Sequence, residues 1–208
     1  MELQRLTRLS DLIFAVAMTL MALTFDPPPV SGITSQEITA FLQAQLPSFG
    51  AYVLTFLVIA FYWTSHLHQF KYYQKTDPIH MSLVLLSLLF VVFLPYANDL
   101  LTFYDDVFAV QVFYSLAAGG VGIFSTVTWI YATYNRRLVA PNLSDKIIRE
   151  IRQGSYTEPT ILLLAIGGAW LHPLGWTVTL VVGFPLIFLS QSLLQEPEHK
   201  LQSDGENT

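Results

Sequence analysis

Four polar side chains stand where the first apolar, helix-length segment of the chain begins. They are Arg5, Arg8, Ser10 and Asp11, and the sequence from residue 12 to residue 25 is almost entirely apolar. A carboxylate at the edge of hydrocarbon is costly, and proteins usually keep one because it is paired or used. Arg8 lies three residues before Asp11, a spacing that allows an ion pair along a helix. The pattern predicts a membrane-spanning helix whose carboxylate is held in a polar network or exchanges protons.

The second apolar segment supplies candidate partners for this carboxylate. It runs back across the membrane, so Trp63 and His66 should reach the depth of Asp11. We expect a buried network of Ser10, Asp11 and His66, to which the Trp63 indole N–H donates. Such a network could simply fasten the first helix to the second. Alternatively, Asp11 or His66 titrates and tunes gating or proton flow, because histidine changes charge near physiological pH.

The opposite side of the first helix carries a stripe of bulky apolar residues. At about 100° per residue, the stripe begins at Arg5 and contains Leu9, Leu12, Ile13, Val16, Leu20 and Leu23. The polar pair lies on the other side, with Ala15, Ala17, Met18 and Ala22. An aliphatic stripe of this kind can face lipid, another helix or a pore. Its spacing alone does not distinguish these three environments.

The composition places the chain among integral membrane proteins. Of its 208 residues, 53% are hydrophobic and only 12% are charged, which is unlike a soluble globular domain. The net charge of −5 is spread between apolar runs, so nothing indicates nucleic-acid binding. The chain has no cysteine, which excludes disulfides and thiolate metal sites. No strand pattern, phosphate-binding loop or histidine spacing suited to a metal is present, so we expect neither a cofactor nor an enzyme.

We predict an all-α fold with six transmembrane helices. Each apolar segment is long enough to cross a hydrocarbon core of about 30 Å, and the segments are 8–25, 49–70, 81–101, 107–134, 157–171 and 176–194. A short amphipathic helix is expected at 35–46, with Ser35 as its N-cap. Residues 1–195 then form one six-helix transmembrane unit, and 196–208 form a solvated cytoplasmic tail.

The basic residues predict the orientation. All ten Lys and Arg fall at one end of the predicted bundle, which by the positive-inside rule places both termini in the cytoplasm. The opposite end carries Asp26, Glu37, Asp105 and Asp106 and no basic residue. An acidic outer mouth would concentrate cations, although exported loops are often simply poor in basic residues.

Several motifs of the chain resemble those of one known family. The sequence Arg5-x-x-x-Leu9-Ser10-Asp11 resembles the R-x-x-x-F-S-D signature of the endolysosomal potassium channels and their bacterial homologues, the transmembrane protein 175 family. Leu9 stands where phenylalanine is usual. Further matches are Trp63, His66, Lys75-Thr76-Asp77 and Phe93-Leu94-Pro95-Tyr96.

The resemblance implies a potassium-permeable channel whose first helix lines a pore enclosed by an oligomer, a homotetramer for relatives with one six-helix unit. Val16, Leu20 and Leu23 would then form stacked hydrophobic rings that act as a gate by dewetting. The sequence has no T-V-G-Y-G-type carbonyl filter, so preference for potassium over other monovalent cations would depend on how readily each ion sheds water there. A single unit without a targeting extension suggests a prokaryotic plasma membrane.

A proton-conducting channel or a proton-coupled secondary transporter that uses Asp11 and His66 is the alternative. Carriers of that kind usually contain inverted repeats and broken helices. No repeat is evident in the chain, and only Gly183-x-Pro185 suggests a broken helix.

Overall fold

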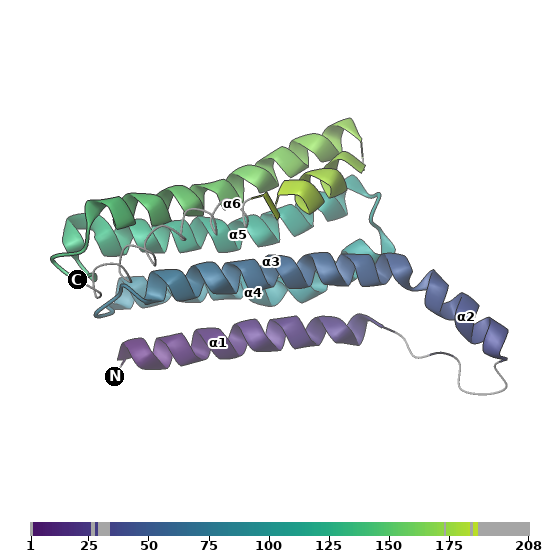
Figure 1. The fold of residues 1–208 in the computed structure, drawn as a ribbon, viewed down its shortest axis with the longest axis horizontal. Helices are drawn as coiled ribbons and strands as arrows, with labels where there is room; N and C mark the ends of the chain where they lie inside the picture. Colours follow the sequence, from purple (N-terminus) through teal and green to yellow (C-terminus); the bar gives the residue numbers. More distant parts are fainter. Residues whose placement is uncertain (1, 26–27, 29–33, 173, 184, 187–208) are drawn as a thin grey trace, which may run out of the picture.

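The computed structural model describes residues 2–186 apart from 26–27, 29–33, 173 and 184 (Figure 1). The described part of the chain is helical, and its one β-bridge joins Tyr73 to Val139. The helices are α1 (Glu2–Leu20), η1 (Met21–Thr24), α2 (Ser35–Ala44), α3 (Leu46–Phe70), α4 (Pro78–Phe103), α5 (Phe108–Thr133), η2 (Tyr134–Arg136) and α6 (Asp145–Leu171), followed by the short helix Leu174–Gly183.

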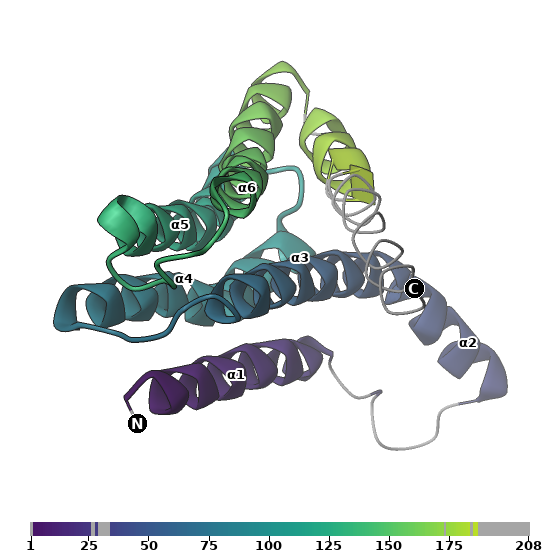
Figure 2. The same cartoon turned by 60° about the vertical axis from the view of Figure 1, so that its left-hand side comes forward.

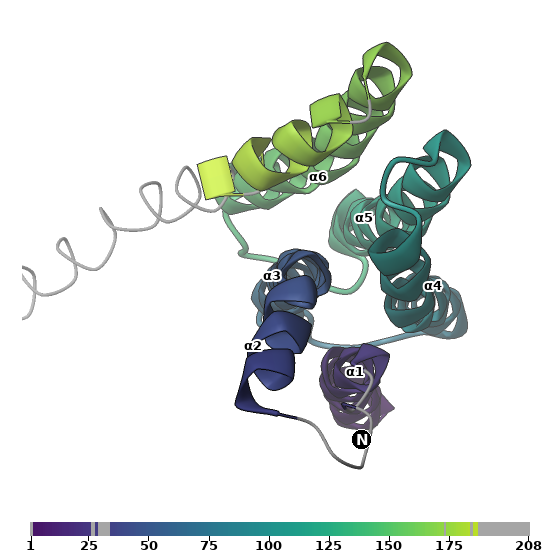
Figure 3. The ribbon, with the colours of Figure 1, turned by 90° about the vertical axis from the view of Figure 1, so that its right-hand side faces the viewer.

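The long helices run side by side along one axis. In Figure 1 the N-terminus, the α3–α4 connection and the α5–α6 connection lie at one end, while α2 and the α4–α5 connection lie at the other. The view along the axis in Figure 3 places α1 at one edge of the bundle, next to α3 and α4, and α6 at the opposite edge, next to α5. The oblique view in Figure 2 shows the same arrangement. The basic residues of the described chain therefore gather at the end where α1 begins.

Within the part of the chain that the structure describes, four helices are long and apolar enough to cross a membrane, which supports a multi-pass membrane protein. They are Glu2–Leu23, Leu46–Phe70, Pro78–Phe103 and Phe108–Arg136. They correspond to the first four predicted segments. The ends of each helix differ by a few residues from the ends that the sequence predicted. Continuous apolar runs bounded by proline, aspartate or basic residues make such helices easy to place.

The fifth and sixth predicted segments differ from the observed helices. The fifth, 157–171, is only the second half of α6, which begins at Asp145 because Ser144 caps it through the Lys146 N–H. The first half of α6 is charged on its exposed side and packs Ile148 and Ile151 against the core. The sixth segment, 176–194, coincides with Leu174–Gly183 in its first part. Residues 187–194 and the tail 196–208 lie outside the described residues.

The predicted cap of α2 was wrong by one residue. Thr34, rather than Ser35, is the N-cap, and it forms a reciprocal capping box with Glu37. The Thr34 hydroxyl accepts from the Glu37 N–H, and the Glu37 carboxylate accepts from the Thr34 N–H at 2.8 Å. Because Thr34 keeps an extended backbone conformation, the helix begins after it.

Glycines allow the closest approaches between helices. At Gly120 of α5 the space for a side chain is filled by the Phe90 ring of α4. Gly168 of α6 and Gly175 meet backbone to backbone, so that an added Cβ on either would lie within 3 Å of the other's carbonyl oxygen. Small residues are the usual means by which membrane helices approach closely.

Candidate pore helix and its polar anchor

One face of α1 is buried in the bundle. Leu6, Ser10, Phe14 and Ala17 are buried along this face, and Met21 continues it into η1. They pack against α3 and α4. Their spacing of three and four residues is that of one helical stripe. The packing of this face fixes the rotation of α1 about its own axis.

The apolar stripe on the other side of α1 is uncovered. Leu9, Leu12, Val16, Leu20 and Leu23 have exposed fractions between 42% and 77%. Ile13 was placed in this stripe from the helical wheel, but it is partly buried and packs against the core. It lies about 60° from Val16, toward the buried face. The stripe is therefore narrower than the sequence predicted.

The end of the stripe lies in a tighter helix. α1 stops at Leu20, and Met21–Thr24 form a 3₁₀ helix. In a 3₁₀ helix, side chains three residues apart eclipse each other, which keeps Leu23 in line with Leu20. The stripe also borders a small groove of about 170 Å³, which is lined by Leu12, Ile13, Val16, Ala17, Leu20, Val92 and Pro95.

A hydrogen bond between helices joins the signature of α1 to α3. The indole Nε1–H of Trp63 donates to Oδ1 of Asp11 at 3.0 Å. Asp11 is half-buried and Trp63 is 37% exposed, so the bond lies at the rim of the bundle. A hydrogen bond to an ionised carboxylate is stronger than a neutral one. The bond anchors α1 to α3 on the side away from the exposed stripe.

The other expected members of the polar network lie elsewhere. The fully buried Ser10 hydroxyl donates to the carbonyl of Leu6 at 2.9 Å, within its own helix. Ser10 and Asp11 are consecutive residues, about 100° apart on a helix, and so cannot face the same partner.

His66 packs against aromatic rings instead of the carboxylate. Its ring lies 4.1 Å from Phe70 and 5.6 Å from Phe14, centroid to centroid. Its Nε2 is buried without a hydrogen-bond partner among the described residues. Arg5 and Arg8 are exposed, and neither forms an ion pair with any described residue. The structure therefore joins Asp11 to Trp63 by a hydrogen bond. The other four predicted members of the network lie outside that bond: Arg5, Arg8, Ser10 and His66.

A second polar cluster, which the sequence did not reveal as a cluster, surrounds Asp77. Its carboxylate caps α4 by accepting from the His80 N–H at 2.9 Å. It also accepts from the Tyr131 hydroxyl at 2.8 Å and from Nε of Arg137 at 3.1 Å. The Arg137 guanidinium lies 4.9 Å above the Tyr131 ring. Burial alone would raise the pKa of Asp77, but the hydrogen bonds and the Arg137 charge outweigh it and hold that pKa below its ordinary value.

The two connections at this end of the bundle are paired through their backbones. Gln74 N–H donates to the Leu138 carbonyl at 2.9 Å, beside the bridge between Tyr73 and Val139. Asn135 and Arg136 have positive φ values of 49° and 51°, a conformation that turns the chain sharply. In the sequence, the motif Lys75-Thr76-Asp77 and the Asp-Pro step at 77–78, typical of a helix start, mark Asp77, but neither indicates its partners Tyr131 and Arg137.

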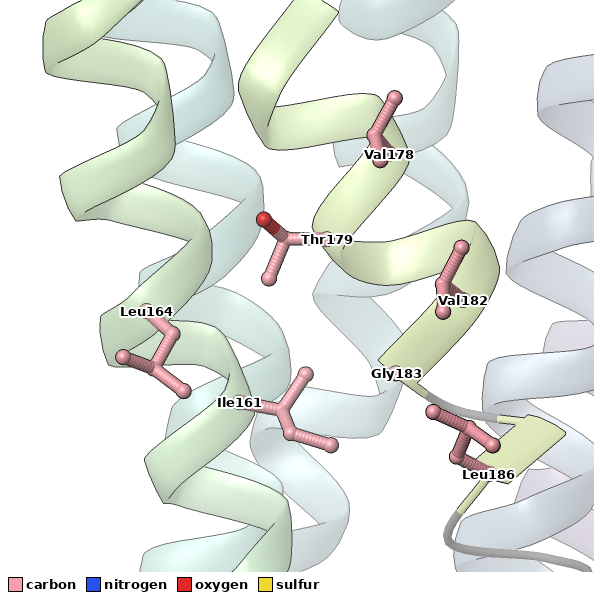
Figure 4. Close-up of a pocket in the computed structure, with 7 residues that line it drawn as sticks. All are labelled: Ile161, Leu164, Val178, Thr179, Val182, Gly183 and Leu186. Carbon is pink, nitrogen blue, oxygen red and sulfur yellow. The ribbon is translucent and has the colours of Figure 1, made fainter.

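A larger groove lies between α6 and the helix Leu174–Gly183 (Figure 4). These two helices lie on the side of the bundle away from α1 (Figure 3). It measures about 530 Å³ and is lined by Ile161, Leu164, Val178, Thr179, Val182, Gly183 and Leu186. The Thr179 hydroxyl donates to the Gly175 carbonyl at 2.7 Å. No group of acidic or histidine residues suited to a metal occurs in the described part of the chain. The groove therefore offers apolar surface and no evident site for chemistry.

Comparison with known proteins gives a consistent result. The family model described as endosomal/lysosomal potassium channel TMEM175 matches residues 5–95. The chain is 31% identical over 155 residues to a potassium channel of Streptomyces collinus, covering 73% of this chain and 74% of that protein. It is 27% identical over 192 residues to a potassium channel of Chamaesiphon minutus, covering 89% and 94%. It is 25% identical over 141 residues to the human endosomal/lysosomal proton channel TMEM175, and it spans only 28% of that longer protein.

A solved structure has the same fold. The crystal structure of a lysosomal potassium-selective channel TMEM175 homologue from Chamaesiphon minutus superposes with a TM-score of 0.79 at 21% identity, covering 91% of this chain and 97% of that one. Fold and relatives together define a helical membrane protein of the ion-channel class, which is not a class of enzymes. The chain belongs to the TMEM175 family of potassium channels.

Proposed function

We propose that this protein is a potassium-permeable cation channel whose pore is enclosed by α1 from four copies of the chain. The observation that carries the proposal is the uncovered apolar stripe on the helix that also bears the family signature. Its opposite face is packed against α3 and α4, and Trp63 holds Asp11 on the side away from the stripe. Val16, Leu20 and Leu23 are therefore free to meet their counterparts around an axis.

The spacing of these residues suits a hydrophobic constriction. Val16 and Leu20 are four residues apart at about 1.5 Å per residue, and Leu20 and Leu23 are three apart at about 2.0 Å in the 3₁₀ helix. Both steps are about 6 Å, so three successive rings would form a constriction about 12 Å long. Such a constriction gates by dewetting. Ions that hold their water loosely, such as potassium, would pass more easily than sodium.

We propose an oligomer because the exposed stripe of a single α1 cannot enclose a pore by itself. A closed ring of identical copies places the same residue at one level. Arg5, exposed at the start of the stripe, would then surround the inner mouth.

The proposed topology has six spans, with α6 and the segment from Leu174 as the fifth and sixth, and both termini in the cytoplasm of a prokaryotic cell. It is supported by the gathering of basic residues at one end of the bundle. Single cysteines at Glu37 and Asp105 should react with an impermeant thiol reagent added outside intact cells. Cysteines at Lys75 and Lys146 should react only after permeabilisation. Outside labelling at Lys75 would contradict the topology.

Proton conduction is the second candidate function. The human and chicken relatives are named as endosomal/lysosomal proton channels, and His66 packs against Phe14 of α1 with its Nε2 buried and unpartnered within the described structure. A proton that reached this nitrogen would lie directly behind the proposed pore helix.

Currents through the purified protein separate these functions. In a planar bilayer that contains only this protein, a channel gives unitary current steps, whereas a carrier gives none. Under a potassium gradient at symmetrical pH, the reversal potential should follow the potassium equilibrium. A reversal potential that follows only an imposed pH gradient would favour proton conduction, and a complete absence of steps would contradict the channel proposal.

A further inference from the structure

α6 has an unusual division between a charged first half and an apolar second half. The apolar half, residues 157–171, would span only about 22 Å at about 1.5 Å per residue, and this count includes Glu158. A hydrocarbon core of about 30 Å needs about 20 residues. Twenty residues counted back from Leu171 end at Arg152. If α6 crosses the membrane, Arg152 therefore lies at the inner edge of the hydrocarbon, with Arg149 one turn further out.

The packing of the first half fixes which side of α6 faces outward. The Trp129 indole N–H donates to the Ile148 carbonyl at 3.1 Å, and the Thr126 hydroxyl donates to the Ser155 carbonyl at 3.0 Å. Ile151 also packs against the core. Arg149, Arg152 and Tyr156 are exposed and share an arc of about 60° on a helical wheel. We call these three residues the α6 basic site.

The two arginines of this site differ from three nearby basic residues, each of which pairs with an acidic residue of the described structure. Arg136 pairs with Asp145 at 2.7 Å, Arg137 pairs with Asp77 at 3.1 Å, and Lys146 pairs with Glu150 at 3.7 Å. Among the described residues, neither Arg149 nor Arg152 forms an ion pair. Both guanidinium groups are exposed and are therefore available to an anionic ligand.

We propose that the α6 basic site binds the phosphate of an anionic phospholipid in the inner leaflet. This inference rests on the six-span topology of the proposed function. α6 lies at the edge of the bundle opposite α1 (Figure 3), so a pore enclosed by α1 would leave α6 facing lipid. Guanidinium groups bind phosphate through paired hydrogen bonds, and their apolar stems can lie along the hydrocarbon while the charge reaches the headgroup. A bound headgroup also compensates for the short apolar half of α6.

The test measures thermal unfolding of the purified full chain in neutral detergent with added lipid. Phosphatidylglycerol should raise the unfolding midpoint, because a ligand that binds only the folded state stabilises it. Phosphatidylcholine and inorganic phosphate at equal concentration should have no comparable effect. An equal rise with phosphatidylcholine would mean general solvation by lipid. An equal rise with inorganic phosphate would mean a free-anion site, and either result overturns the proposal.

Variants locate the effect on α6. The double change Arg149→Gln and Arg152→Gln should weaken the apparent affinity for phosphatidylglycerol about thirtyfold, because each basic residue near an anionic surface contributes about fivefold. The matched control Lys146→Gln, which removes a basic residue already paired with Glu150, should change it less than threefold. Arg149→Lys with Arg152→Lys, which keeps both charges, should retain most of the affinity and protects the test against a folding defect. Unchanged affinity in the Gln double variant would overturn the proposal.

The channel proposal can be judged separately on the same samples. If the Gln double variant keeps its unitary potassium currents and loses the response to phosphatidylglycerol, both proposals stand. If the wild type conducts but does not respond to phosphatidylglycerol, the lipid site alone is wrong.

Discussion

Two adjacent glycines of α6 provide a sharp test of how the last helices pack. At Gly168 an added Cβ would lie 2.8 Å from the carbonyl oxygen of Gly175 and 2.9 Å from its carbonyl carbon. Both atoms belong to the backbone, so neither can rotate away. At Gly167 an added Cβ would meet no other atom within 4 Å. The variants Gly167→Ala and Gly168→Ala therefore differ in steric overlap and in little else.

The expected magnitude follows from that difference. Replacing glycine by alanine inside a helix gains up to about 1 kcal/mol, and this gain is common to both variants. Overpacking a close contact costs about 1–3 kcal/mol, and only Gly168→Ala incurs it. The unfolding free energies of the two variants should therefore differ by about 1–3 kcal/mol. For a chain of this size, such a difference shifts the unfolding midpoint by on the order of 5 °C.

Intrinsic tryptophan fluorescence during heating in detergent is a suitable assay. Trp176, one of four tryptophans in the chain, is buried next to Gly175, and its indole N–H donates to the Ser115 hydroxyl at 2.9 Å. Its share of the emission reports the opening of this contact. Gly168→Ala should unfold at a lower temperature than wild type, and Gly167→Ala at an equal or higher one. Equal midpoints in the two variants would show that α6 and the helix Leu174–Gly183 do not cross at these glycines.

Two further predictions concern the polar anchors. Trp63→Phe removes the donor to Asp11 and should lower the unfolding free energy by about 0.6–1.7 kcal/mol per chain. This is less than the about 3–5 kcal/mol expected when a fully buried charge loses its partner. Ion preference in bilayer recordings should not change, and a changed preference would place Asp11 on the ion path. Because the pKa of Asp77 is lowered in the folded state, its contribution to stability is present above the ordinary value near 3.8 and is lost as pH falls through the lower folded value. Thermal unfolding of wild type and Asp77→Asn, at pH 7 and again below pH 3.8, measures this contribution. The difference in stability between the two proteins should be smaller at the acid pH. A constant difference would contradict the stabilising role of the Asp77 carboxylate.

The sequence was sufficient to predict the long helices and insufficient for their side-chain partners. Helices α3, α4 and α5 are continuous apolar runs, and their ends lie within a few residues of the predicted ones. The start of α6 was missed because residues 145–156 are mostly polar. Their packing against the core and their hydrogen bonds with Trp129 and Thr126 make them part of the bundle. A hydropathy pattern does not record such contacts.

In the candidate site, too, the sequence predicted the helix but not all of the contacts of its side chains. The helical wheel identified the exposed stripe, but it could not determine how far the core reaches around α1, and so it assigned Ile13 to the stripe. It also grouped Ser10 with Asp11, although the hydroxyl bonds within its own helix. The Asp77 cluster depends on Tyr131 and Arg137, which lie more than 50 residues away along the chain. Partners at that separation become visible only once the helices are assembled.

The central claim, that α1 lines the pore through its exposed stripe, is tested most directly by unitary currents from asparagine variants of α1. Val16→Asn and Leu20→Asn place polar groups within the proposed constriction, where they should ease wetting, raise conductance and reduce the preference for potassium over sodium. Ala22→Asn is the matched control, because Ala22 is exposed but lies away from the stripe, whereas Met18 packs against the core and would disturb folding. The account predicts changes in conductance and selectivity at Val16 and Leu20 and none at Ala22. Equal effects at all three positions, or no effect at any of them, would mean that α1 does not line the pore.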